Sequence, residues 1–391
     1  MADSAGAGTA LLTGVKTRAG VIALDADVAR GDCAGSEGHE VDSLVALAQR
    51  SGRATGIVTT TRLTHATPAV AYGHSPERGW ESDADLPARA VREGCIDLAR
   101  QLIEGPVGRR LQVVFGGGGA EFVARVGPDG SRAGGRRLDG LNLVARWQDL
   151  HPDGLFVEDR AGLLAADPGG GAPVFGLFGA DHLPFEQDRD PGKQPSLAEL
   201  TARALDFLSR DRDGFVLLVE AGRIDHAHHF DNAYRALLAT VELARAVEVV
   251  LERTDPEDTL VVVTSDHGHT LTISGYPTRG NPILGLVVEN DDRGEPLPDP
   301  ALASDGRPYT TLGYANGPSA RTGARSDPGR SDPTAPNFQQ PALVPLEMET
   351  HGGADVPAYA SGPQAHLLVG TFEQNYVFNV ARFALGLGGD R

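Results

Sequence analysis

The sequence predicts an α/β fold in which a doubly wound, mostly parallel sheet carries helices on both of its faces. Short apolar runs such as 215–219 and 259–264 alternate with longer segments whose apolar residues recur at helical spacing. This alternation is typical of parallel sheets that are covered by helices. Both of these runs also end in clusters of acidic residues and histidines, and α/β enzymes place their ligands at such strand ends.

The individual elements follow from local patterns of residues. Helices begin after polar residues or end before glycines, and strands are rich in β-branched residues. We expect helices over 40–50, 87–104, 197–209, 232–252 and 376–385, and strands over 56–61, 111–115, 215–219, 259–264 and 366–370. Residues 290–345 are rich in Pro, Gly, Asp and Ser, with one strand-like run at 310–314, and we expect them to form an insertion within a domain that spans 1–391.

The composition argues against several classes of partner. The 53 acidic residues outnumber the 35 basic ones, and the formal net charge of −18 argues against nucleic acid or an anionic membrane surface. No apolar run approaches the roughly 18 residues that a membrane-spanning helix requires, and no signal peptide is evident at the start. Cys33 and Cys95, the only cysteines, could be buried thiols or one disulfide, and spacing alone leaves both alternatives open.

The strongest functional signal follows the first of the two apolar runs. Glu220, Asp225 and His229 lie close behind it, and because Asp225 and His229 are four residues apart, a helical turn places them on one face. Such a carboxylate and imidazole suit a divalent metal with mixed oxygen and nitrogen ligands, zinc above all. The alternative is a polar loop with surface histidines. Asp266 and His267, directly behind the second run, form another cluster of this kind.

Two further segments offer groups for chemistry. Ser4 enters a predicted helix of small residues, whose N-terminus favours an anion held against the hydroxyl, although a serine there is more commonly an ordinary helix cap. The predicted strand over 56–61 delivers His65 and Thr67 at its end, and Arg78 follows shortly afterwards. These residues add a hydroxyl and a guanidinium to the candidate metal ligands.

Taken together, these motifs resemble those of the alkaline phosphatases, particularly the animal-like branch. The matching stretches run in family order along almost the whole chain: 3–6, 13–17, 59–68, 80–87, 220–229, 264–267, 275–280 and 349–355. The resemblance implies a phosphate monoester hydrolase that uses two zinc ions and one magnesium ion and passes through a phosphoserine. It also implies small-molecule phosphate monoesters as substrates and a homodimer as the assembly.

The resemblance assigns roles to individual residues. Ser4 resembles the nucleophile, and Arg78 resembles the guanidinium that grips the phosphate. The implied metal ligands are Asp225, His229 and His351 for one zinc, Asp266 and His267 for the second zinc, and Glu220 and Thr67 for the third metal, with His65 near the third metal. Paired cations suit this reaction because they bind the phosphate oxygens, ionise the serine hydroxyl and stabilise the leaving alkoxide. His226 and His228 then become neighbours of ligands.

The resemblance also extends to features outside the site. Cys33 and Cys95 match the positions of a disulfide in the animal-type enzymes, which implies a bridge between them and an exported protein. Residues 290–345 correspond to the crown region that caps the dimer interface in those enzymes. Their additional calcium site has acidic ligands where this chain has Gly179 and Gln194, so we expect that site to be lost or weak.

The start of the chain departs from the family pattern. Family members carry, upstream of the serine motif, a strand ending in Asp-Gly-x-Gly whose Asp bridges the second zinc and the third metal. Here Ser4 lies almost at the start, so we expect Met1 to be a misassigned start or a fragment boundary, the first strands to be missing, and an apolar sheet edge to be uncovered. The alternatives are a related metallohydrolase for diesters or sulfates, or an inactive truncated fragment that binds zinc.

Overall fold

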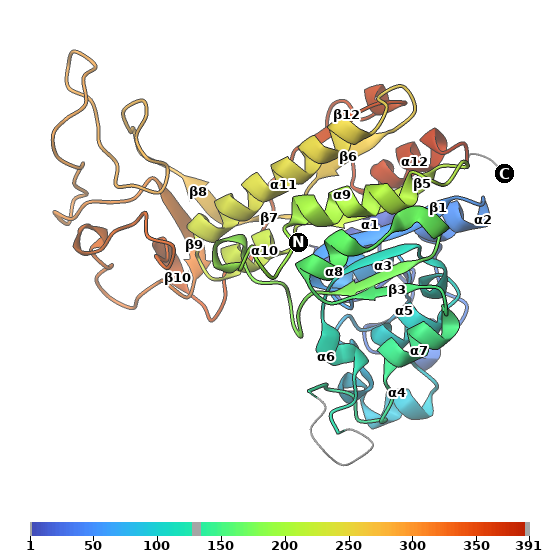
Figure 1. Ribbon diagram of the computed structural model, residues 1–391. Helices are drawn as coiled ribbons and strands as arrows, with labels where there is room; N and C mark the ends of the chain where they lie inside the picture. The colour runs from blue at the N-terminus through green and yellow to red at the C-terminus, as the bar shows by residue number, and fades with distance from the viewer. Residues whose placement is uncertain (1, 127–133, 388–391) are drawn as a thin grey trace.

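The central element of the fold is a five-stranded parallel sheet. The computed structural model describes residues 2–126 and 134–387. Within them the strands follow the order β3-β4-β2-β1-β5, and every neighbouring pair is parallel (Figure 1). The strands are β1 (Ala54–Arg62), β2 (Val113–Gly117), β3 (Leu155–Val157), β4 (Val174–Leu177) and β5 (Phe215–Glu220). The predicted α/β class is therefore confirmed.

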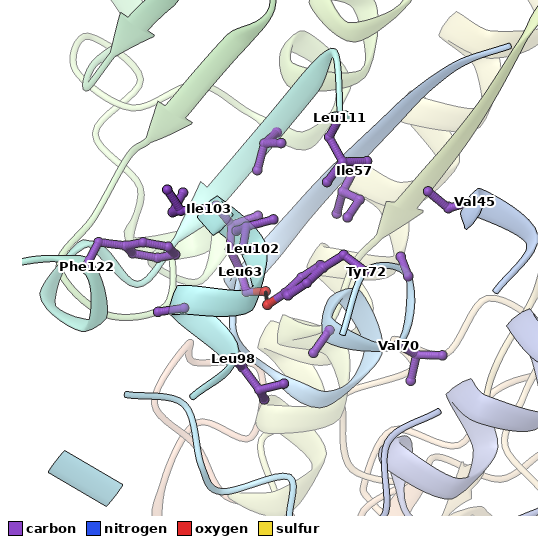
Figure 2. Close-up of a cluster of buried hydrophobic side chains, with 14 of the residues drawn as sticks. Val45, Ile57, Leu63, Val70, Tyr72, Leu98, Leu102, Ile103, Leu111 and Phe122 are labelled. Carbon is purple, nitrogen blue, oxygen red and sulfur yellow. Dashed lines mark hydrogen bonds between the residues drawn. The ribbon is translucent and has the colours of Figure 1, made fainter. Parts of the chain in front are cut away.

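Helices cover both faces of this sheet, because successive side chains of a strand point to opposite sides. On β1, Ile57 belongs to one buried apolar cluster and Val58 to the other. The first cluster, part of which Figure 2 shows, joins the sheet to α1 (Ser4–Thr13), α2 (Leu44–Arg50), α3 (Ala66–Val70), α5 (Leu98–Glu104), α6 (Gly119–Phe122) and α7 (Leu143–Leu150). The second joins it to α8 (Arg160–Ala165), α9 (Leu197–Leu208) and α11 (Ala233–Arg253).

The strand β5 forms one edge of the sheet. It pairs with β1 on one side, and among the described residues no strand pairs with its other side. The strand predicted over 259–264 is present as β6 (Val261–Thr264), but it does not join the five-stranded sheet. It pairs instead, antiparallel, with β12 (Ala358–Ser361) in a separate ribbon. The expectation of an apolar edge left uncovered by missing strands stays a prediction, since β3 forms the other edge of the same sheet.

The single helix predicted over 87–104 is wrong, because the chain forms two helices there. These are α4 (Ala88–Arg92) and α5, separated by a turn in which Gly94 has a φ of +90°, a value that glycine adopts without strain. Asp97 then starts α5 by accepting a hydrogen bond from the backbone N–H of Arg100. No helix in the described ranges has the length and apolar character that crossing a bilayer would need.

The strand predicted over 366–370 is also wrong. The chain instead makes one 3₁₀ turn over Ala365–Leu367, between two glycines with left-handed backbone, Gly362 and Gly370. Backbone of this kind interrupts the extended conformation that a ladder requires. The pairing partner of β6 is supplied earlier in the chain, by β12. The closing helix is present as α12 (Asn375–Ala384).

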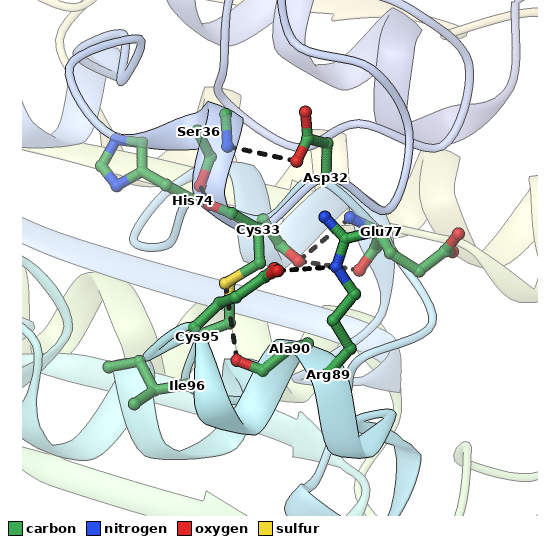
Figure 3. The surroundings of a disulfide bond; sticks show 12 residues. Asp32, Cys33, Ser36, His74, Glu77, Arg89, Ala90, Cys95 and Ile96 are labelled. Carbon is green, nitrogen blue, oxygen red and sulfur yellow. Dashed lines mark hydrogen bonds and ion pairs between the residues drawn. A yellow bond between two sulfur atoms is a disulfide. The ribbon is translucent and has the colours of Figure 1, made fainter.

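The implied disulfide between Cys33 and Cys95 is confirmed. Their Cα atoms lie 5.9 Å apart, and the two residues are separated by 62 positions in the sequence. The bridge belongs to a small apolar cluster with Trp80 and Ala90. Figure 3 shows Ala90 beside the two cysteines. The bridge therefore ties the loop after α1 to the turn that divides α4 from α5.

The predicted insertion contributes to a second sheet at one end of the molecule. The run predicted as a strand over 310–314 overlaps β9 (Leu312–Gly317), which pairs with β8 (Leu271–Ile273) on one side and β10 (Ala342–Pro345) on the other. Figure 1 shows this three-stranded sheet at the left, together with long loops. Its order is β10-β9-β8.

A buried arginine, Arg137, connects the start of α5 with the segment that precedes α7. Arg137 has a fully buried side chain, and its guanidinium contacts both carboxylate oxygens of Asp97 at 2.8 and 3.0 Å. It also donates to both oxygens of Asp139, at 3.1 and 2.5 Å. Because Asp97 caps α5, the arginine fixes the start of that helix.

Replacing Arg137 should be strongly destabilising. We expect Arg137→Met to lower the free energy of unfolding by about 3–5 kcal/mol, because it leaves two carboxylates without their buried partner. Urea denaturation would measure this. As a control, Arg89→Ala removes a solvent-exposed pair with Glu93 and should change the free energy of unfolding far less, because water screens that pair. Equal effects of both substitutions would contradict the expectation.

Candidate active site

Four segments that are far apart in the sequence converge at the candidate site. Directly after β5, the helix α10 (Arg223–His229) carries Asp225 and His229. The turn after β6 carries Asp266 and His267 and leads into β7 (Gly268–His269), which pairs antiparallel with β11 (His351–Gly352). The start of α1 brings Ser4. The β7–β11 pairing sets His351 directly opposite His269.

The first group of candidate ligands consists of Asp225, His229 and His351. Asp225 Oδ2 lies 3.3 Å from His229 Nε2, and Asp225 Oδ1 lies 3.4 Å from His351 Nε2. Zinc ligands bind at about 2.0–2.2 Å, so two ligands of a tetrahedral zinc lie roughly 3.3–3.5 Å apart. Ligand atoms of Asp225, His267, His269 and His351 all lie within 4.8 Å of one another, and those of His229, His269 and Glu349 form a second such group. The described residues therefore offer a metal ion more donors than the three that the sequence predicted. The predicted helical spacing of Asp225 and His229 is what brings them together.

The second group adjoins the first. His267 Nε2 lies 3.3 Å from Asp266 Oδ2 and 3.3 Å from Ser4 Oγ, which is again the separation of two ligands of one zinc. The same nitrogen is 3.8 Å from Asp225 Oδ1. A serine hydroxyl thus lies among metal-binding groups, and its side chain is almost fully buried.

The carboxylate of Asp225 lies at the centre of these contacts. Burial alone would raise its pKa, but hydrogen bonds with His229, His269 and His351 hold the pKa well below the usual range for an aspartate. The group therefore remains an anion over a wide pH range. A buried anion surrounded by imidazoles is suited to a divalent cation, because the imidazoles can exchange protons for the metal.

The third group surrounds Glu220, the last residue of β5. Its carboxylate accepts hydrogen bonds from the hydroxyls of Thr59 and Thr61, and Thr67 also bonds to it. Burial raises the pKa of Glu220 to about 7, and the nearby charge of Asp266 adds to this. No arginine, lysine or histidine in the described part of the chain pairs with it. The oxygen-rich surroundings fit a hard cation such as magnesium.

Arg78 and His65 lie together beside the serine. Arg78 Nη1 is 3.0 Å from Asp3 Oδ2, and Nη2 is 3.1 Å from His65 Nε2. Asp3 also caps α1 by accepting from the backbone N–H of Gly6. The residue next to the serine therefore holds the guanidinium in position.

His269 and Glu349 were not among the predicted site residues. His269 Nε2 lies 2.8 Å from Asp225 Oδ1, and its Nδ1 lies 2.6 Å from Glu349 Oε2. Burial lowers the pKa of His269, but these two carboxylates raise it to about 9. A sequence signal existed for His269, because it stands two residues after His267 and alternate residues of an extended segment share a side. Nothing comparable distinguished Glu349.

The other two histidines of α10 point to different partners. His226 Nδ1 lies 2.8 Å from Arg223 Nη1, and its ring lies 4.4 Å from that of His182. His228 Nδ1 lies 2.9 Å from the hydroxyl of Tyr314 on β9. Both therefore surround the candidate ligands.

Known proteins match the chain along its length. The family model for alkaline phosphatase matches residues 1–387. The tissue-nonspecific alkaline phosphatase of Gallus gallus is 42% identical over 399 residues, covering 100% of this chain and 74% of the relative. The human tissue-nonspecific isozyme is 40% identical and covers 99% of this chain and 73% of its own length. An alkaline phosphatase of Gadus morhua is 39% identical.

Solved structures agree on the fold. A cold-active alkaline phosphatase from a Shewanella species has a TM-score of 0.63 at 21% identity, covering 99% of this chain and 86% of that one. The enzyme from the Antarctic bacterium TAB5 has a TM-score of 0.62, covering 98% and 84%. With the family match and the relatives of about 40% identity, the chain belongs to the alkaline phosphatase family, whose members are metal-dependent phosphate monoester hydrolases.

Proposed function

We propose that this phosphatase works through a phosphoserine on Ser4, with two zinc ions and one magnesium ion. Asp225, His229 and His351 would hold one zinc, and Asp266 and His267 the second, next to the serine. Glu220 and Thr67 would hold magnesium, with His65 near it. The observation that carries the proposal is the 3.3 Å separation of Ser4 Oγ and His267 Nε2, which suits a nucleophile and an imidazole that share an ion.

In the proposed reaction, Ser4 attacks the phosphorus atom and Arg78 binds the phosphoryl oxygens. Bound divalent ions would supply positive charge that favours the ionised serine hydroxyl and balances the phosphate dianion. Ser4 Oγ attacks phosphorus, the bond from phosphorus to the leaving oxygen breaks, and the departing alcohol gains a proton. Water then attacks the phosphoserine, the Oγ–phosphorus bond breaks, and inorganic phosphate leaves. Arg78, held by Asp3, would give two parallel hydrogen bonds to the phosphoryl oxygens.

Ser4→Ala should abolish turnover of an aryl phosphate, by about 10³-fold or more, because no other hydroxyl takes its place. Acid quenching of the wild-type enzyme during turnover, followed by mass spectrometry, should find one phosphoryl group on the peptide that contains Ser4. Ser209→Ala, at an exposed position beyond α9, is the matched control and should retain full activity. Phosphate on a different residue, or an active Ser4→Ala variant, would contradict the mechanism.

The metal assignment predicts that substitutions in different ligand groups remove different metal ions. Metal analysis should give two zinc ions per wild-type chain, and exhaustive chelation should remove activity that zinc and magnesium together restore. Asp225→Asn should bind one zinc fewer, whereas Glu220→Gln should keep both zinc ions and lose the stimulation by magnesium. Glu248→Gln, at an exposed position on α11, serves as the control. A wild-type chain with fewer than two zinc ions would refute the assignment.

We infer a homodimer that forms through the three-stranded sheet. Ile273 on β8 is 72% exposed and Leu343 on β10 is 78% exposed, and several apolar neighbours are exposed as well: Val344, Leu346 and Met348. These exposed apolar side chains lie on or beside β8 and β10, the two outer strands of that sheet, and exposed apolar residues of this kind are typical of a protein interface. The disulfide supports a location outside the reducing cytosol, in an oxidising compartment such as the periplasm or the cell exterior.

Sedimentation equilibrium should find a dimer for the wild-type protein and a monomer for Leu343→Glu, because the new charge would be buried without a partner at the interface. Val91→Glu changes an equally apolar, 56% exposed residue on α4 and should remain dimeric. A monomeric wild-type protein, or a Leu343→Glu variant that still dimerises, would contradict the inference.

A further inference from the structure

Glu349 is a buried acidic residue that contacts His229 directly and Asp225 through His269. Its side chain is completely buried, and it lies two residues before His351. One carboxylate oxygen accepts from the backbone N–H of Thr270 at 2.5 Å and from its hydroxyl at 2.7 Å. The other lies 2.6 Å from His269 Nδ1. No lysine or arginine in the described ranges contacts it, so its charge is balanced by imidazoles and dipoles.

The backbone of Glu349 contacts a different ligand. Its carbonyl oxygen lies 2.6 Å from His229 Nδ1, and its N–H donates to the carbonyl oxygen of His229 at 3.0 Å. An Nδ1–H donated to a carbonyl leaves Nε2 of the imidazole with a free lone pair. That nitrogen is the one that lies 3.3 Å from Asp225 Oδ2. The backbone contact therefore sets both the tautomer and the direction of His229.

The side chain of Glu349 reaches the second ligand through one intermediate. His269, held at Nδ1 by Glu349, contacts Asp225 Oδ1 with its Nε2 at 2.8 Å. His269 also stands opposite His351 in the β7–β11 pair. One residue thus acts on His229 through its carbonyl group and on Asp225 through its carboxylate.

We propose that Glu349 is the positioning residue of the first zinc site, fixing the orientation of Asp225 and His229 before the ion binds. This inference rests on the proposed zinc assignment and adds the residue that determines the affinity of that site. Groups that orient the ligands of a metal typically change its affinity by about 10–100-fold when they are removed. The second zinc site, built on Asp266 and His267, has no contact with the Glu349 carboxylate among those described and should be affected little.

The structure suggests variants that separate orientation from general stability. Glu349→Ala removes the link to His269. Glu349→Gln preserves it, because the Thr270 N–H fixes the amide oxygen on its own side and so turns the amide nitrogen towards His269 Nδ1. His269 can then still donate from Nε2 to Asp225. Thr270→Val removes a hydrogen bond to the same carboxylate while leaving its contact with His269, and is the matched control.

The experiment measures zinc affinity by competition with a chromophoric chelator, together with the visible spectrum of the cobalt-substituted enzyme. Glu349→Ala should bind its weaker zinc about 10–100-fold less tightly than wild type, with an altered cobalt spectrum and an unchanged second site. Glu349→Gln and Thr270→Val should stay within about threefold of wild type, since both preserve the orientation of the ligands. Thermal unfolding of the metal-free proteins checks that each variant folds. If Glu349→Ala does not fold, His269→Phe cuts the same link to Asp225 and should weaken one zinc about tenfold.

The outcomes distinguish this inference from the proposed function. A wild-type chain that binds no zinc would overturn the metal assignment itself. Two zinc ions in the wild-type chain, with neither affinity nor the cobalt spectrum changed by Glu349→Ala, would overturn only the positioning role. Equal weakening of both zinc sites would also overturn it, because that result indicates a general structural role.

Discussion

The carboxylate of Asp225 is the contact on which the site depends. It lies within 3.8 Å of nitrogens from four imidazoles, those of His229, His267, His269 and His351. Those histidines come from α10, from the turn after β6 and from two short paired strands. Burying an isolated carboxylate would be costly, so the surrounding imidazoles and a bound cation are what make its position tenable. The segments that carry these four histidines must therefore all place an imidazole next to the same carboxylate.

The parallel sheet explains how these segments reach one place. Thr59 on β1 stands in register with Glu220 on β5, so the ends of the two strands present a hydroxyl and a carboxylate side by side. Only two residues separate the end of β5 from α10, so Asp225 follows Glu220 by five positions. Glu220 and Asp225, which we propose to hold different metal ions, thus lie close together on the chain. Glu220 lies at the end of a strand and Asp225 on the following helix, so their carboxylates reach different parts of the site.

The sequence predicted those parts of the structure that depend on local pattern. The apolar run before Glu220 and the four-residue spacing of Asp225 and His229 both correspond to observed elements, β5 and α10. The link from His269 to Glu349 depends on pairing between strands about 80 residues apart, which periodicity does not encode. The break between α4 and α5 depends on Gly94, whose left-handed backbone outweighed a helical pattern. The Cys33–Cys95 bridge came from family resemblance, since spacing alone left the thiols undecided.

Two groups of contacts, one made by Asp3 and one made by Glu349, come together near Ser4. On one side, Asp3 caps the helix that carries Ser4 and also binds Arg78, so one carboxylate links the serine to the guanidinium. On the other side, Glu349 holds the ligands around Asp225. The two groups come together where Ser4 Oγ meets His267 Nε2, and where the Ala2 carbonyl lies 3.1 Å from His351 Nδ1. Because the start of α1 contacts both His267 and His351, a shift of that helix would disturb the serine and both of these histidines together. Under the proposed mechanism, the geometry of attack would be set by the fold rather than by any single flexible side chain.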